Sequence, residues 1–335
     1  MLPLQPLRLT RPLWLAATLC SLCLHAAAFD LQGHRGARGL APENTLPGFA
    51  KTLGVGVTTL ETDLAISRDG VLLISHDPAL NPDITRGPDG QFLATRGPVI
   101  WHTDHAELLR YDVGRLKPGT RYAAQYPDQQ PHDGARLPRL QDLFALVERS
   151  GNREVRFALE IKTRPDAPAD TAAPDAFARK VVDAVRAAGV AQRTTILSFD
   201  WRALQAVQQM APDIGTVYLS IQRPNFDNIG ASKPNGSAWT AGLRYADHGS
   251  VPKLIHAAGG RIWSAFQGDL DAEQVKQAKA LGLTVLAWTV NEPARMAQVM
   301  DMGVDGIVTD RPDLLRDVIA KRGLPLPRPT PVRVD

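Results

Sequence analysis

Carboxylate and imidazole side chains accompany apolar, strand-like segments at several places in this 335-residue chain. Glu61 and Asp63 are two residues apart, so on a strand both project to the same side. With Glu160 they form an all-oxygen ligand set, which suits Mg²⁺ or Ca²⁺, whereas zinc favours His or Cys ligands. His34 and His76 add a general base and a general acid for use near neutral pH. These five residues predict one divalent cation, Ca²⁺ or Mg²⁺, beside two proton-transfer groups.

Two cationic side chains accompany these groups in the sequence. Arg35 directly follows His34, and Lys162 lies two residues after Glu160, so both supply fixed positive charge that complements a phosphate. A cation, phosphate clamps and paired imidazoles together indicate cleavage of a phosphodiester. Structural alternatives stay open, in which Lys162 simply pairs with Glu160 and Arg35 binds Glu43.

Further polar and aromatic residues end other strand-like segments. Trp288 is interpreted either as a wall against the alcohol of the substrate or as a packing residue. Ser198 and Asp200 are predicted to cap the helix that follows them. Asp310 precedes an Arg-Pro pair and is interpreted as part of a turn that leads into a helix.

Residues 61–77 alternate at strand period on both sides of Asp69-Gly70, which predicts a tight β-hairpin. If these two residues alone fill the turn, Asp63 lies opposite His76 at roughly 5 Å. The flanking leucines and isoleucine predict that the hairpin is at least half buried. Buried carboxylates need a partner or a metal, so this burial favours the functional interpretation.

Strand–helix alternation runs through the rest of the chain. The predicted strands are 29–36, Thr58–Ile66, Arg156–Thr163, Thr194–Asp200, Thr216–Ile221, Arg261–Phe266, Thr284–Asn291 and Gly306–Asp310. The predicted helices are one that begins at Asn44 as its N-cap, Leu140–Arg149, Asp175–Ala188, Trp201–Met210, Ala272–Leu281 and Glu292–Met300. Eight strands with crossover helices predict an α/β fold, a (β/α)8 TIM barrel with a β-hairpin arm and a long insertion after it. A doubly wound open sheet is the alternative, but the chain lacks its Gly-rich nucleotide fingerprint.

Barrel enzymes carry their active sites at the C-terminal ends of the strands. In the third predicted barrel strand the odd positions from 157 to 161 are apolar, so Ala158, Glu160 and Lys162 share the other face. The pattern therefore places the carboxylate and the lysine together at the mouth of the barrel.

The segment 78–137 is rich in Pro, Gly, Asp and Arg and has no sustained periodicity. Long insertions of this composition are typically functional loops or lids. Its histidines, His102, His105 and His132, match no zinc-binding spacing and are predicted to lie on the surface.

The first 28 residues have the features of an export signal. Arg8 and Arg11 precede an apolar run from Leu13 to Leu24, and residues 26–28 are alanines suited to cleavage. The run is shorter than the roughly 20 residues of a membrane span, so no stable membrane insertion is expected. We therefore expect domains at 1–28 (secretion signal peptide), 29–323 (barrel) and 324–335 (a frayed tail), in a periplasmic or secreted protein.

Charge and cysteine content exclude some functions. Both cysteines, Cys20 and Cys23, lie inside the leader, so the mature chain is predicted to use neither disulfides nor thiol catalysis. Without Arg8 and Arg11 the chain has 36 basic and 35 acidic residues, a net charge of +1. A nucleic-acid partner is not expected from so balanced a chain.

Seven short motifs occur in the order found in one enzyme family. They are His34-Arg35-Gly36, Pro42-Glu43-Asn44-Thr45, Glu61-Thr62-Asp63, Ser75-His76-Asp77, Glu160-Ile161-Lys162, Trp288-Thr289-Val290-Asn291 and Gly306-Ile307-Val308-Thr309-Asp310. Each alone is weak, but the ordered series spans nearly the whole mature chain and resembles the glycerophosphodiester phosphodiesterase family. Two stretches of the insertion, 80–86 and 111–119, resemble its bacterial periplasmic branch.

The resemblance implies metal-dependent hydrolysis of glycerophosphodiesters, such as glycerophosphocholine and glycerophosphoethanolamine, to sn-glycerol 3-phosphate and an alcohol in glycerophospholipid degradation. It implies a divalent ion on the three carboxylates, acid–base roles for the two histidines and phosphate contacts for Arg35 and Lys162. The small-molecule diester is the expected partner.

Three other functions are less consistent with the sequence. A phospholipase-type phosphodiesterase acting on phosphoinositide or sphingomyelin lipids needs an apolar rim, but the insertion is polar. A non-catalytic glycerophosphodiester-binding protein would not need all the polar residues, and a metal-dependent sugar isomerase explains neither Arg35 nor Lys162.

Overall fold

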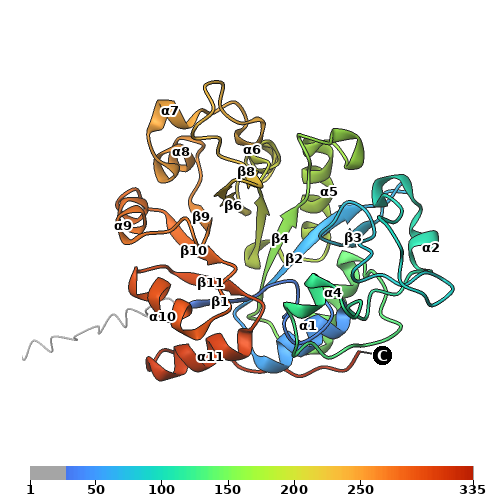
Figure 1. Cartoon of the computed structure of the whole chain (residues 1–335). Coiled ribbons are helices and arrows are strands. Elements are labelled where there is room, and N and C mark those ends of the chain that lie inside the picture. Colours follow the sequence, from blue (N-terminus) through green and yellow to red (C-terminus); the bar gives the residue numbers. More distant parts are fainter. Residues whose placement is uncertain (1–27, 335) are drawn as a thin grey trace, which may run out of the picture.

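Eight parallel strands close into a barrel in the computed structural model, which describes residues 28–334. The strands are β1 (Asp30–Gly33), β2 (Thr59–Ile66), β4 (Arg156–Ile161), β5 (Thr194–Ser198), β6 (Gly215–Ser220), β9 (Ile262–Phe266), β10 (Thr284–Trp288) and β11 (Gly306–Thr309). They pair in the order β1-β11-β10-β9-β6-β5-β4-β2, and the pairing of β1 with β2 closes the ring. Helices surround these strands (Figure 1), so the predicted (β/α)8 barrel is confirmed.

One main helix follows each barrel strand or the arm attached to it. These helices are α1 (Leu46–Val55), α4 (Leu140–Arg149), α5 (Pro174–Ala187), α6 (Trp201–Met210), α8 (Val251–Ala257), α9 (Ala272–Ala280), α10 (Pro293–Asp301) and α11 (Pro312–Lys321). The predicted helices agree to within a residue or two. α8 was not predicted, and for α11 only its start after Asp310 was expected. Asp200 caps α6 as expected, because its carboxylate accepts a hydrogen bond from the Arg202 backbone N–H at 3.2 Å.

The N-cap of α1 differs from the prediction. Thr45, not Asn44, caps this helix, and its hydroxyl accepts the Gly48 N–H at 3.2 Å. Asn44 has a left-handed backbone, with φ of 55°, and its side chain is used in the site described below.

Alternation along the strands separates two apolar layers. On β4, Phe157, Leu159 and Ile161 pack between the strands and the helices. Inside the barrel, a smaller cluster contains Ala158, Leu197, Val217, Leu219 and Leu286. Since Ala158 points inward, Glu160 and Lys162 follow it on the inner face toward the barrel mouth, as predicted.

The hairpin arm has a different register from the one predicted. β3 (Leu72–Ile74) pairs antiparallel with β2 so that Leu64 faces Ile74 and Ile66 faces Leu72. The loop has three residues, 68–70, rather than two, and Gly70 supplies the left-handed residue with φ of 82°. Asp63 therefore lies opposite Ser75, whose N–H donates to the Asp63 carbonyl at 3.0 Å, and the predicted pairing of Asp63 with His76 is wrong.

The insertion 78–137 is folded against the arm. Its short helices are η1 (Ile100–His102), α2 (His105–Leu108) and α3 (Arg121–Ala124). An apolar cluster joins arm and insertion through Ala65, Leu73, Leu80, Ile100, Leu108, Val113 and Leu137. As expected, His102 and His132 are exposed, while His105 is half-buried. The insertion therefore has a small core of its own.

Other short elements decorate the remaining connections. They are η2 (Pro168–Asp170), η3 (Ala191–Arg193), β7 (Gln222–Arg223), β8 (Phe226–Asp227), η4 (Ala238–Thr240) and α7 (Tyr245–His248). The last four lie between β6 and α8.

The C-terminal tail is docked rather than frayed over its described residues. The Thr330 N–H donates to the Leu53 carbonyl at 2.8 Å, and Arg316 donates to the Pro327 carbonyl at 2.7 Å. Val332 and Val334 pack on the core. The expectation of fraying is wrong because the tail's own backbone N–H and carbonyl groups are hydrogen-bonded to the rest of the protein, although its side chains are largely polar or Pro.

The predicted export signal lies outside the described residues, apart from Ala28. Between residues 28 and 334, none of the helices has the length and apolar character that crossing a bilayer requires.

Candidate active site

Three buried carboxylates meet on β2 and β4 at the mouth of the barrel. Glu61, Asp63 and Glu160 are 3%, 1% and 6% exposed, and one ligand oxygen from each lies within 4.8 Å of the others. The strand register sets Asp63 beside Glu160, and Glu61 shares their face because it is two residues from Asp63. The structure thus brings together the three predicted metal ligands.

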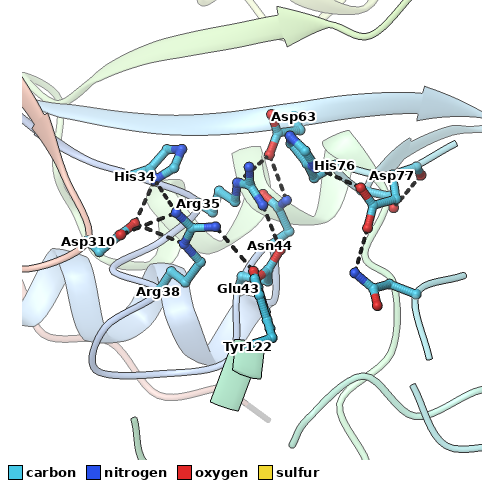
Figure 2. Close-up of polar contacts among 12 residues, drawn as sticks. His34, Arg35, Arg38, Glu43, Asn44, Asp63, His76, Asp77, Tyr122 and Asp310 are labelled. Atoms are coloured by element: carbon cyan, nitrogen blue, oxygen red, sulfur yellow. Dashed lines mark hydrogen bonds and ion pairs between the residues drawn. The ribbon is translucent and has the colours of Figure 1, made fainter. Parts of the chain in front are cut away.

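Cationic and amide groups surround this triad, and Figure 2 shows Arg35 and Asn44 beside Asp63. Lys162 Nζ lies 3.0 Å from Asp63 Oδ1 and 2.7 Å from Glu160 Oε1. Arg35 Nε lies 3.2 Å from Asp63 Oδ2, and the Asn44 amide donates to the same oxygen at 2.9 Å. Asp63 Oδ1 and Glu160 Oε1 are buried without a well-oriented hydrogen bond, so they keep lone pairs for another ligand.

The carboxylates differ in their affinity for protons. Burial, together with the charges of Asp63 and Glu160, raises the pKa of Glu61 well above its ordinary value. Burial raises the pKa of Glu160 to about 7, against the opposing effect of Lys162. For Asp63 burial is outweighed, because Lys162 and Arg35 hold its pKa well below the usual range. The raised pKa values of Glu61 and Glu160 mean that the site does not easily accommodate three negative charges, and a bound cation would offset that charge.

The backbone after β1 takes left-handed conformations that aim a donor at the triad. Arg35 and Ala37 have φ of 50° and 59°, uncommon values for residues with a Cβ. The Arg35 N–H donates to Glu61 Oε2 at 2.9 Å. Gly36, with φ of 71°, is required here because a Cβ would lie 3.0 Å from the backbone of α1 at Gly48 and Phe49.

His34 is held by a buried carboxylate. Its Nδ1 lies 2.6 Å from Asp310 Oδ1, and Arg38 Nε donates to the same oxygen at 2.9 Å. Arg38 and His34 overcome burial and hold the pKa of Asp310 well below its usual range, so its carboxylate accepts the Nδ1 proton. Burial lowers the pKa of His34 to about 4. The ring is therefore neutral near pH 7, and its Nε2, 3.9 Å from Glu61, is free to accept a proton.

His76 has an equivalent arrangement on the other side of the site. Its Nδ1 lies 2.8 Å from Asp77 Oδ1, and Asn81 donates to the second oxygen of Asp77 at 2.7 Å. His76 overcomes the effect of burial and lowers the pKa of Asp77 to about 2, so a carboxylate again orients the imidazole. Loss of hydration and the charges of Arg35 and Lys162 lower the pKa of His76.

A second network connects the insertion with the triad (Figure 2). Arg35 Nη1 donates to Glu43 Oε1 at 2.9 Å, and the Tyr122 hydroxyl of α3 donates to Glu43 Oε2. Arg38 Nη1 also donates to the Tyr122 hydroxyl at 3.1 Å. The insertion therefore fixes the position of Arg35 through Glu43.

Two cavities adjoin the triad. The narrower, of about 140 Å³, is lined by His34, Arg35, Glu61 and Trp288 among others. The wider, of about 460 Å³, continues past His76 and Trp288. Trp288 therefore lines both, although its indole N–H also donates to a strand carbonyl, that of Ser264, at 3.1 Å. A larger cavity of about 680 Å³ lies under the tail at the other strand ends, far from this chemistry.

All eight predicted site residues converge here. The structural alternatives are present as well, since Lys162 pairs with Glu160 and Arg35 with Glu43. The residues that sequence reasoning missed in this role are Arg38, Asn44, Asp77, Tyr122 and Asp310. The role of Asp310 could have been predicted from its position at the end of a barrel strand. Tyr122 had none, because it meets Glu43 across 79 positions.

Comparisons with known proteins agree with this geometry. The family model described as "Glycerophosphoryl diester phosphodiesterase family" matches residues 34–314. A Silicibacter pomeroyi protein assigned to the glycerophosphoryl diester phosphodiesterases has a crystal structure with a TM-score of 0.80 and 36% identity, over 90% of this chain and 96% of that one. The glycerophosphodiester phosphodiesterase of Caldanaerobacter subterraneus subsp. tengcongensis is 26% identical over 87% of this chain and 97% of its own.

A further structure shows the same fold at lower identity. It is an Oleispira antarctica phosphodiesterase in complex with the product sn-glycerol-3-phosphate, with a TM-score of 0.61 and 23% identity, over 86% of this chain and 96% of that one. The family match begins at His34 and extends beyond Asp310, so it includes every residue of the site described above. The chain belongs to the glycerophosphoryl diester phosphodiesterase family.

Proposed function

We propose that this protein hydrolyses glycerophosphodiesters, such as glycerophosphocholine and glycerophosphoethanolamine, to sn-glycerol 3-phosphate and an alcohol. The observation that carries the proposal is a buried triad of carboxylates between two carboxylate-oriented imidazoles, with Arg35 and Lys162 beside it. Family membership supports the same activity.

Glu61, Asp63 and Glu160 would hold one divalent cation, Ca²⁺ or Mg²⁺. Their donor set is all oxygen, and two of these oxygens, although paired with Lys162, are buried without a well-oriented hydrogen bond. When bound, the cation supplies neutralisation of phosphate charge. Such an ion would balance the charge of the three carboxylates once all of them are ionised.

The site's side chains bind the phosphate and transfer the protons. Arg35 and Lys162 hold the phosphate and stabilise the charge that develops on its oxygens. One histidine removes the proton from the attacking hydroxyl as its oxygen bonds to phosphorus, and the other protonates the alcohol oxygen as the old ester bond breaks. Trp288 lines the path of the alcohol.

Asp310→Asn is expected to lower kcat about 10- to 100-fold with little change in KM. The amide no longer stabilises the Nδ1–H form of His34, and its NH₂ group favours the wrong tautomer. Steady-state kinetics with glycerophosphocholine measures the effect. Asp200→Asn is the matched control, since Asp200 is equally buried at a strand end but bonds to Thr163 and Arg202 instead of a histidine. Equal kcat values for both variants would contradict the role of Asp310.

We also propose that the protein is exported and represents the bacterial periplasmic branch of the family. The proposal rests on the basic and apolar pattern of the first 28 residues and on the two stretches of the insertion. Fractionation of cells that express the full chain, with N-terminal sequencing of the product, tests it.

Metal add-back tests the main proposal. Metal-stripped protein is incubated with glycerophosphocholine, Ca²⁺ or Mg²⁺ is added separately, and sn-glycerol 3-phosphate is followed. We expect activity only after one of the ions is added. Undiminished activity in the stripped protein, or no product with either ion, would count against the proposal.

A further inference from the structure

The wide cavity beside the triad can accommodate one of the two ester groups of a diester substrate. It shares His76, Glu160 and Lys162 with the narrow cavity, so the two spaces adjoin at the expected phosphate position. The narrow cavity is of a size for a small polar group, whereas about 460 Å³ is in the range of ligand pockets. The wide cavity is therefore suited to the variable alcohol.

Four aromatic rings line this cavity in a connected arc. Phe199 follows β5, Phe226 belongs to β8, Trp239 to η4 and Trp288 to β10. Their ring centroids are 5.3 Å apart for Phe199–Phe226, 5.1 Å for Phe226–Trp239 and 5.4 Å for Phe199–Trp288, all edge to face. Each ring is only half-buried, so the arc presents aromatic surface to the cavity instead of filling it.

The charges of the cavity wall favour one kind of cation. Each carboxylate there already has a hydrogen-bond or ion-pair partner within 2.8 Å: Asp77 has the His76 ring, Glu160 has Lys162 and Asp166 has Arg164. A primary ammonium in the arc would lose hydrogen bonds to water without a free carboxylate to replace them. A quaternary ammonium has no N–H to satisfy and is attracted by ring faces. Lys162 Nζ already lies 5.8 Å from the centre of Phe199, so a ligand cation would rest mainly on the other three rings.

We propose that the arc of Phe199, Phe226, Trp239 and Trp288 binds a quaternary ammonium group on the leaving alcohol of the substrate. The enzyme then prefers choline-type diesters to those of primary amino alcohols. This inference rests on the proposed function and names the substrate class within it.

Three diesters that differ in one group test the inference. They are glycerophosphocholine, glycerophosphoethanolamine and the 3,3-dimethylbutanol diester, a neutral analogue with the shape of choline. For the wild type we expect kcat/KM for the choline diester to be about tenfold above that for the other two, which is about 1.4 kcal/mol. Comparison with the neutral analogue separates charge from shape.

Trp239→Leu keeps an apolar side chain but removes a ring. It is expected to lower kcat/KM for glycerophosphocholine about tenfold and to leave the other two diesters within twofold, which also shows that the fold is intact. Trp239→Phe should keep most of the preference because it retains a ring face. Trp101→Leu is the matched control, since Trp101 is half-buried in the insertion and outside this cavity.

The outcomes are distinct. Equal cleavage of all three diesters by the wild type, or an equal loss for all three in Trp239→Leu, would overturn the inference and leave the proposed function standing. Cleavage of none of them with Ca²⁺ or Mg²⁺ present would refute the proposed function, and the inference with it.

Discussion

Replacement of His34 or His76 by alanine is expected to reduce kcat for glycerophosphocholine by about 10²- to 10⁴-fold, the usual contribution of a positioned acid or base. Each imidazole has its Nδ1 fixed by a carboxylate, at 2.6 Å for His34 and 2.8 Å for His76, so each presents its other nitrogen to the substrate. Alanine removes the proton carrier and leaves the triad and the cationic groups in place. Steady-state kinetics and thermal unfolding of both variants measure the effect.

The controls separate chemistry from folding. His132→Ala makes the same change at an exposed histidine of the insertion and should leave kcat unaltered. Added imidazole should restore part of the activity of His76→Ala, because the His76 side chain is 33% exposed and lines the wide cavity. The double variant should lose far less than the product of the single losses, since the two residues act in one reaction. Near-normal kcat in both single variants would refute the acid–base assignment.

The parts of the site on barrel strands were predictable because strand period and burial agree there. All eight residues of β2 are buried, so its polar positions had to face a site and not water. On β4 the alternate apolar residues face the helices, so Glu160 and Lys162 must face the inside of the barrel. Parallel strands in a barrel then bring their ends together, which is sufficient to predict the triad.

The hairpin shows where local rules are insufficient. Asp-Gly fits both a two-residue turn and the last positions of a three-residue loop, and the two differ by one residue in register. Ser67 decides between them, because its hydroxyl and N–H bond to Val71 and close the longer loop. His76 nevertheless reaches the site, because it follows the end of β3 instead of sitting opposite Asp63.

The network around the histidines depends on contacts that are distant in sequence. Asp310 meets His34 across 276 positions, and its place before an Arg-Pro pair equally fits a helix start. Arg38 and Tyr122 have no periodicity that predicts their partners. Their positions are set by the turn after β1 and by the docking of α3, which are tertiary features.

Glu61→Gln is expected to lower kcat by at least about 10³-fold and yet to leave the metal-free protein as stable as the wild type, or more stable. The variant loses a metal ligand, so the charge neutralisation worth several kcal/mol is lost. Without metal, however, Glu61 is one of three buried carboxyl groups within 4.8 Å, and its removal relieves their repulsion. The glutamine carbonyl can still accept the Arg35 N–H that Glu61 accepts at 2.9 Å.

Thermal unfolding with and without Ca²⁺ or Mg²⁺ distinguishes this effect from simple damage. An ion at 100 times its Kd should raise the Tm of the wild type by roughly 5 °C, from about 2.7 kcal/mol of binding energy. Glu61→Gln should lose this increase while its metal-free Tm does not fall. Asp310→Asn, which keeps the triad, should retain the increase although its turnover is reduced, so loss of metal and loss of catalysis are separated. If the metal-free Tm of Glu61→Gln were several degrees below that of the metal-free wild type, Glu61 would be a stabilising residue of the fold. That result would contradict the interpretation of the triad as a cation-binding site.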